Sequence, residues 1–142
     1  MQDKQRVPPR VMIAAPNGRS GKTMVSIGLC ALLRKDGLAV QPFKKGPDYI
    51  DASWLTAASG VACRNLDAYL MAKDVLINNF CRSSLGNDFA LIEGNMGLYD
   101  GVDGGREGSS AHLARLLKTP VVLVVNTARM TRSVAALIKG YM

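Results

Sequence analysis

The feature that most limits the fold of this chain is the stretch from Ala15 to Thr23, which reads APNGRSGKT. It ends with Gly-Lys-Thr, as phosphate-binding loops do, but Pro16 stands where the pattern G-x-x-x-x-G-K-[ST] has its first Gly. An apolar run of strand type, 10–16, precedes the stretch, and 22–35 has the apolar spacing of a one-sided helix. Because a strand before and a helix after confirm this motif, we interpret it as a phosphate-binding loop rather than an incidental helix start.

Apolar runs of strand length alternate with helical stretches along the rest of the chain. Further strands are expected at 38–43, 89–94 and 120–126, and helices at 51–60, 73–85, 110–117 and from about 132. Pro42 indicates a strand end or an edge strand. Residues 1–9 are expected to form an N-terminal tail, and 10–142 to belong to one domain. The alternation predicts an α/β fold in three layers, a parallel sheet with helices on both faces.

Composition argues against several classes of function. The chain of 142 residues carries a net charge of +7, but its basic residues are scattered and not interleaved with aromatic ones. We therefore expect a polyanionic small ligand rather than a nucleic-acid partner. No apolar run approaches the roughly 20 residues that cross a bilayer, so no membrane partner is expected. The polar first residues and three cysteines without C-x-x-C spacing favour a cytoplasmic, reduced protein.

Three polar loops follow predicted strands, namely APNGRSGKT, KKGPDYID and EGNMGLYDG. In open parallel sheets, ligands bind beyond the carboxyl ends of the strands. We therefore expect these loops to open onto one crevice.

The first loop supplies the predicted nucleotide-binding residues. They are Asn17, Gly18, Arg19, Ser20, Gly21, Lys22 and Thr23. Backbone N–H groups can approach phosphate here, the Lys22 ammonium can reach the β- and γ-phosphates, and the Thr23 hydroxyl can coordinate Mg²⁺. The N-terminus of the following helix adds partial positive charge to this anion site.

Acidic residues of the other two loops are candidate ligands for the same Mg²⁺. We expect Asp48 and Glu93 to act as a pair around one ion, next to Thr23. Two carboxylates so close together repel one another unless a divalent ion neutralises them, so without metal the amide variants should fold normally or slightly better. Asp51 either faces the site or only caps the following helix. Asp100 and Asp103 face either substrate or solvent.

Four segments resemble the amino-terminal synthetase domain of cobyrinic acid a,c-diamide synthases. They are KKGPDYIDASWLTAASG, RNLDAYLM, IEGNMGLYDG and AHLARLLKTPVVLVVN, and the resemblance runs from Val11 onward. That domain is in turn similar to dethiobiotin synthetase, which implies a P-loop NTPase-like fold. In both families the stretch before Gly-Lys-Thr is one residue longer than usual, so Ala15 takes the place of the first small residue and Pro16 is expected.

The sequence departs from the family pattern at three positions. Arg19 stands where the family has Gly, which affects the backbone conformation of the loop. Ala52 and Leu55 stand where Pro and His are more common, which leaves the choice of substrate open.

The resemblance implies an ATP- and Mg²⁺-dependent amidation of the a and c carboxylates of a corrinoid or related tetrapyrrole. ATP phosphorylates each carboxylate, and ammonia displaces the acyl phosphate. Lys22 and Thr23 would hold phosphate and Mg²⁺, with Asp48 and Glu93 as the carboxylates on the metal side. Lys44 would stabilise the transferring phosphoryl group. The residues expected to line the substrate are Tyr49, Asp51, Asn95, Met96, Leu98, Tyr99 and Asp100.

Family members take ammonia from glutamine through a further, C-terminal glutaminase domain. None of Cys30, Cys63 and Cys81 lies in the G-x-C-x-G setting of a glutaminase nucleophile, so we expect this chain to be the first part of the synthetase domain of a longer enzyme, inactive by itself. Homodimerisation stays open.

Two alternative functions also stay open. One is amidation of another tetrapyrrole, nickel sirohydrochlorin or hydrogenobyrinic acid. The other is a nucleotide switch of the ParA/MinD type. Those proteins carry a second, signature Lys early in the phosphate-binding loop, and this chain has Asn17 there, which argues against this alternative.

Overall fold

A computed structural model describes residues 7–142 and contains a five-stranded sheet in which every strand pair is parallel. The strands are β1 (Arg10–Ala14), β2 (Val40–Lys45), β3 (Arg64–Leu66), β4 (Phe89–Glu93) and β5 (Val121–Leu123). Their order across the sheet is β3-β2-β4-β1-β5. The strand β4 therefore lies between β1 and β2, which are consecutive in the chain.

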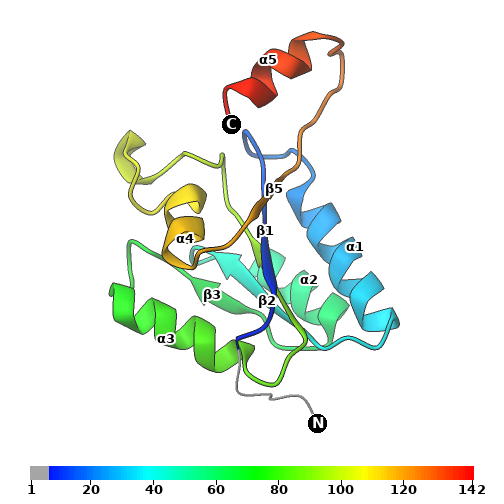
Figure 1. Ribbon diagram of the computed structural model, residues 1–142, viewed down its shortest axis with the longest axis vertical. Helices are drawn as coiled ribbons and strands as arrows, with labels where there is room; N and C mark the ends of the chain where they lie inside the picture. Colours follow the sequence, from blue (N-terminus) through cyan, green and yellow to red (C-terminus); the bar gives the residue numbers. More distant parts are fainter. Residues whose placement is uncertain (1–6) are drawn as a thin grey trace.

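Helices cover both faces of this sheet, as Figure 1 shows. On one face lie α1 (Lys22–Lys35) and α2 (Ile50–Ser59), and on the other lie α3 (Lys73–Ser84) and α4 (Ser110–Leu116). A short 3₁₀ turn, η1 (Val102–Gly104), interrupts the loop before α4, and α5 (Ser133–Lys139) lies beyond the end of the sheet. The predicted α/β architecture in three layers is confirmed.

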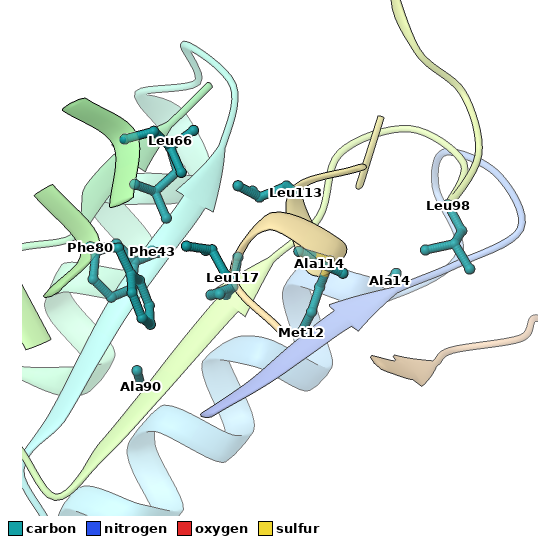
Figure 2. Packing of buried hydrophobic residues seen from close by; sticks show 12 residues of the cluster. Met12, Ala14, Phe43, Leu66, Phe80, Ala90, Leu98, Leu113, Ala114 and Leu117 are labelled. Carbon is teal, nitrogen blue, oxygen red and sulfur yellow. The ribbon is translucent and has the colours of Figure 1, made fainter. Parts of the chain in front are cut away.

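Two hydrophobic cores, one on each face, follow from the alternation of side chains along the strands. In β1, Met12 and Ala14 face the α3–α4 layer, whereas Ile13 packs with Cys30 of α1 and Leu55 of α2. Figure 2 shows the larger core, in which the rings of Phe43 and Phe80 meet with centroids 4.9 Å apart. The two cores together contain Met12, Ile13, Ala14, Cys30, Val40, Phe43, Leu55, Leu66, Leu76, Phe80, Ala90, Leu91, Ile92, Leu98, Leu113, Ala114 and Leu117.

The structure differs from the sequence prediction in β2 and β3. The three-residue β3 was not predicted, and β2 begins and ends two residues later than the expected 38–43. Pro42 lies inside β2, and β2 is an interior strand of the sheet, so neither the predicted strand end nor the predicted edge strand is found. Because β3 pairs only with the last three residues of β2, Pro42 has a single neighbouring strand, β4, and its missing N–H interrupts no second ladder.

Two further sequence predictions concern the chain ends and membranes. Of the expected tail 1–9, residues 1–6 lie outside the described part of the chain, and β1 begins at Arg10.

No helix within residues 7–142 is both long and apolar enough to cross a bilayer.

Candidate active site

The centre of the site is a cross-strand pair at the carboxyl edge of the sheet. Lys44 and Glu93 are register partners on the neighbouring strands β2 and β4. Their positions in the alternation place both side chains on the face covered by α1 and α2. The Lys44 Nζ lies 2.9 Å from the Glu93 Oε1, and the two residues are only 1% and 0% exposed. A buried charge is stable only when it is paired, so each residue requires the other.

Two aspartates of the GPDYID segment complete the surroundings of the Lys44 ammonium. The Asp51 Oδ2 lies 2.7 Å from the Nζ, and the Asp48 Oδ2 lies 3.8 Å from it. Burial alone would lower the pKa of Lys44, but the charge of Glu93 and the hydrogen bond to Asp51 outweigh it, so the pKa of Lys44 is raised. Burial would raise the pKa of Asp51, but the hydrogen bond from Lys44 outweighs it and lowers that pKa.

The same aspartates fix the start of α2. The N-cap residue of α2 is Tyr49, and the Asp48 Oδ1 just before it accepts a hydrogen bond from the Asp51 N–H at 3.0 Å, which satisfies one free N–H of the first turn. Asp51 itself lies in the first turn, and the interpretation that it only caps this helix is wrong. Tyr49, a predicted substrate residue, is exposed at the same end of α2. Leu55, where the family more often has His, is fully buried in the core.

Thr23 links this charged cluster to the phosphate-binding loop. Its Oγ1 donates to the Glu93 Oε1 at 2.7 Å, so that one oxygen accepts from both Thr23 and Lys44. The other oxygen, Oε2, is buried and has no hydrogen-bond partner within the described residues. An unpartnered carboxylate oxygen beside a hydroxyl fits a hard cation such as Mg²⁺.

The chain alone does not form a complete cage for such an ion. Residues 7–142 contain no group of three His, Cys, Asp or Glu side chains placed to hold a metal. Mg²⁺ commonly binds through one or two carboxylates together with phosphate oxygens and water, and the residues present fit that kind of site.

The phosphate-binding loop (15–21) surrounds the Lys22 ammonium. The Lys22 Nζ donates to the Asn17 carbonyl at 3.0 Å and to the Met96 carbonyl at 3.0 Å. Burial first, and the charge of Lys44 second, lower the pKa of Lys22. The Ser20 Oγ also donates to the Asn17 carbonyl, at 3.0 Å. No acidic residue occupies the first turn of α1, so the helix N-terminus is left for an anion.

Two residues of this loop have left-handed backbone. Gly21, the N-cap of α1, has φ 94°, and Arg19 has φ 55°. Gly adopts this conformation without strain, whereas an Arg does so at a cost. Arg19, where the family has Gly, thus occupies a position whose backbone conformation favours Gly. Gly18 lies between Asn17 and Arg19 with open space around it.

The Gly-rich loop (94–109) lies against the phosphate-binding loop. The Leu98 N–H donates to the Ala15 carbonyl at 2.8 Å, and a Cβ on Gly97 would lie 2.5 Å from the Pro16 carbonyl oxygen. Leu98, another predicted substrate residue, is mostly buried in the core and also lines a cavity beside Tyr99. The Asp100 Oδ2 accepts from the Gly97 N–H at 2.9 Å, so this carboxylate supports the loop.

Three other predicted substrate residues and Asp103 have distinct positions in this loop. Met96 and Tyr99 are exposed, and Tyr99 stacks on Tyr141 with ring centroids 5.3 Å apart. Asn95 is held through its backbone by Ser110. Asp103 is exposed and belongs to η1, away from the hydrogen bonds described above.

A family match supplies an independent view of this site. Residues 11–142 match the family model described as the CobQ/CobB/MinD/ParA nucleotide binding domain. The chain belongs to this family. The nucleotide-binding domain thus covers both the phosphate-binding loop and the Lys44–Glu93 pair.

Curated proteins similar to this domain have related names. A cobyrinate a,c-diamide synthase of Magnetococcus marinus is 48% identical over 134 residues, which cover 94% of this chain and 29% of the relative. A hydrogenobyrinate a,c-diamide synthase of Streptomyces coelicolor is 51% identical over 134 residues, or 28% of its length. The resemblance predicted from the sequence is confirmed. The chain spans a little under a third of the length of these relatives.

Two residues that contact the loops of this nucleotide-binding domain were not predicted. The Ser110 Oγ accepts from the Asn95 N–H and donates to the Asn95 carbonyl, both at 3.2 Å. The Tyr141 Oη donates to the Pro16 carbonyl at 3.0 Å. In the sequence, Ser109 and Ser110 indicate only the start of α4, and the residues around Tyr141 contain no motif, so the sequence held no signal for either contact.

Proposed function

We propose that this chain is the nucleotide-binding part of an ATP- and Mg²⁺-dependent amide ligase that amidates the a and c carboxylates of a corrinoid. The observation that carries the proposal is the fully buried Glu93, whose Oε1 accepts from both Thr23 and Lys44 and whose Oε2 has no partner within the described residues. The Thr23 hydroxyl, directly after the phosphate-binding loop, and the Lys44 ammonium thus both donate to the carboxylate of Glu93. The printed names of the similar proteins supply the substrate class.

The residues have separate tasks in the proposed reaction. Lys22 and the backbone N–H groups before α1 would bind the β- and γ-phosphates. Thr23 and Glu93, with Asp48 nearby, would hold Mg²⁺, which would neutralise charge on the phosphate oxygens. Lys44 would face the phosphoryl group during its transfer, since its ammonium lies at the same carboxylate.

The proposed chemistry has two steps. A carboxylate oxygen of the substrate attacks the γ-phosphorus, the bond from that phosphorus to the β,γ-bridging oxygen breaks, and ADP leaves. Ammonia then attacks the acyl carbon, inorganic phosphate leaves with the electrons of the C–O bond, and the nitrogen loses a proton to give the amide. In the whole protein we propose that glutamine supplies this ammonia through a further domain.

The corrinoid could carry cobalt or lack it, since one relative is named for cobyrinate and another for hydrogenobyrinate. Initial rates with each acid at equal concentration distinguish these substrates. Nickel sirohydrochlorin is included as a third candidate.

The test uses the full-length protein with ATP, Mg²⁺, ammonium and cobyrinic acid. Wild type should form ADP and a diamide in a corrinoid-dependent way, and Lys22→Ala should lower that rate by about 100-fold or more, since it removes a preorganised phosphate contact. Lys35→Ala, at the exposed other end of α1, serves as control. Wild-type turnover by the Lys22→Ala protein would exclude the proposed role of this loop.

A second candidate function is a nucleotide switch, because the family description also names MinD and ParA. A switch would dimerise when it binds ATP and would hydrolyse ATP without a corrinoid. Sedimentation of the full-length protein with and without ATP, together with ADP formation without corrinoid, distinguishes the two candidates.

A further inference from the structure

The backbone of Met96 is unusual for a residue other than Gly. Its φ is 53°, in the left-handed region, although the neighbouring Gly97 does not have a positive φ. Strained backbone of this kind persists only where its surroundings enforce it, and it is concentrated at functional sites. Met96 is 57% exposed, so packing in the core does not explain the conformation. The Met96 carbonyl, in contrast, accepts a hydrogen bond from the buried Lys22 ammonium at 3.0 Å.

Hydrogen bonds on both sides of Met96 hold this carbonyl in place. On one side, the buried Ser110 hydroxyl binds both the N–H and the carbonyl of Asn95. On the other, the Gly97 N–H donates to Asp100, and the Leu98 N–H donates to the phosphate-binding loop. The loop around Met96 is therefore fixed despite its glycines, and the direction of its carbonyl is set in advance.

The donors of Lys22 indicate which contact can persist when phosphate binds. An ammonium has three N–H donors, and Lys22 uses two of them, on the carbonyls of Asn17 and Met96. Contacts to two phosphate groups need two donors, so one carbonyl must be released. The Ser20 hydroxyl lies within hydrogen-bond distance of both the Asn17 carbonyl, at 3.0 Å, and the Asn17 Oδ1, so its single proton can turn to the carbonyl when Lys22 leaves. Lys22 is the one hydrogen-bond donor to the Met96 carbonyl within residues 7–142.

We propose that Met96 is a positioning residue, whose left-handed backbone aims its carbonyl at Lys22 and holds that ammonium at the phosphate site. The proposal rests on the proposed function, because it treats Lys22 as a phosphate ligand. The contact persists with phosphate bound and ties the Gly-rich loop to the nucleotide. Met96 thus acts through its main chain and not as the substrate-lining side chain expected from the sequence.

Two substitutions separate the carbonyl from the side chain. Met96→Asn and Met96→Val both remove the thioether, but Asn tolerates the left-handed region and a β-branched Val does not. Affinity for inorganic triphosphate is measured by calorimetry on the full-length protein. Met96→Asn should bind within about twofold of wild type, and Met96→Val about tenfold more weakly, as expected for a lost hydrogen bond to a charged group. If Met96→Val does not fold, Met96→Ala replaces it, because Ala also disfavours this conformation.

Hydrogen exchange of the peptide covering 94–101 provides a second measurement that needs no ligand. In the absence of triphosphate, Lys22→Ala should speed exchange at Met96 and Gly97 roughly tenfold, whereas Lys35→Ala should leave it unchanged. When Lys22 is also replaced by Ala, Met96→Asn and Met96→Val should no longer differ in their affinity for triphosphate. Triphosphate bound to wild type should leave these amides at least as well protected.

The outcomes are decisive in both directions. Equal affinities for Met96→Asn and Met96→Val would overturn the proposal, as would faster exchange at Met96 and Gly97 when wild type binds triphosphate. If wild type does not bind triphosphate at all, the proposed function fails. In that case, unchanged loop exchange in Lys22→Ala would also overturn the contact, and tenfold faster exchange would keep it.

Discussion

Replacing Glu93 by Gln should destabilise the fold even in the absence of any metal. The substitution keeps the size of the side chain but removes the charge that faces Lys44 at 2.9 Å. Lys44 is only 1% exposed and cannot reach water for compensation without moving. From the sequence alone we expected the opposite, since two carboxylates without metal should repel one another. The structure supplies the missing positive charge from Lys44.

The size of the effect follows from what remains around the ammonium. Removing one partner of a buried ion pair typically costs about 3–5 kcal/mol. Asp51 still lies 2.7 Å from the Nζ, with its side chain 27% exposed, and offsets part of that cost. We therefore expect a loss of about 2–3 kcal/mol, equivalent to roughly 4–12 °C for a cooperative unit of about 150–250 residues and to a smaller shift for a longer one.

The assay is thermal unfolding of the full-length protein in EDTA, at neutral pH and moderate salt. Glu107→Gln is the matched control because Glu107 is exposed and forms no ion pair within the described part of the chain. Its melting temperature should stay within about 1 °C of wild type, as is usual for surface substitutions. An unchanged or higher melting temperature for Glu93→Gln would refute the assignment of Lys44 as its buried partner.

Three other perturbations test separate parts of the structure. Gly97→Ala places a Cβ 2.5 Å from a backbone oxygen of the phosphate-binding loop and should lower stability by about 1–3 kcal/mol, whereas Gly28→Ala, with open space in a helix, should not lower it. Because the pKa of Asp51 is lowered, its pairing stabilises the fold above the ordinary pKa of about 3.9 and is lost as pH falls through the lower folded value. The difference in melting temperature between wild type and Asp51→Asn should therefore shrink as pH falls below about 4, and a constant difference would contradict this. Burial raises the pKa of Cys30 to about 11 and of Cys63 to about 12, so at pH 8 at most about one thiol in a thousand is ionised, and mass spectrometry should show slow alkylation of both until the protein is unfolded.

The fold was largely predictable because its strongest signals are local. Apolar runs and helical spacing placed β1, α1 and β4 within one residue or two of their bounds. The signal failed at β3, a three-residue strand with an exposed first residue and no apolar alternation. It also failed at Pro42, because the sequence does not reveal that β3 pairs only with the end of β2.

The sequence named the residues of the candidate site but did not reveal their contacts. The motifs identified Lys44, Asp51 and Glu93 as candidates, because charged side chains after strands are conspicuous. That Lys44 faces Glu93 depends on β4 lying beside β2, a pairing of residues 49 positions apart that no local pattern encodes. The contact between Lys22 and Met96 is equally non-local, and it uses a carbonyl that every residue possesses.

The central position of β4 has a consequence for the order of events during synthesis. When residues 1–88 have emerged from the ribosome, the nascent chain contains β1, β2 and β3, yet β1 and β2 pair with each other only through the strand that is still missing. Parallel pairing over such long separations forms slowly, because the entropic cost of closing the loop comes first. Until β4 arrives, the ammonium of Lys44 lacks its buried counter-charge, and both the β2–β3 pair and the single strand β1 expose unpaired edges. At about 5–20 residues per second the gap lasts only moments, but a pause at this point would leave an aggregation-prone intermediate.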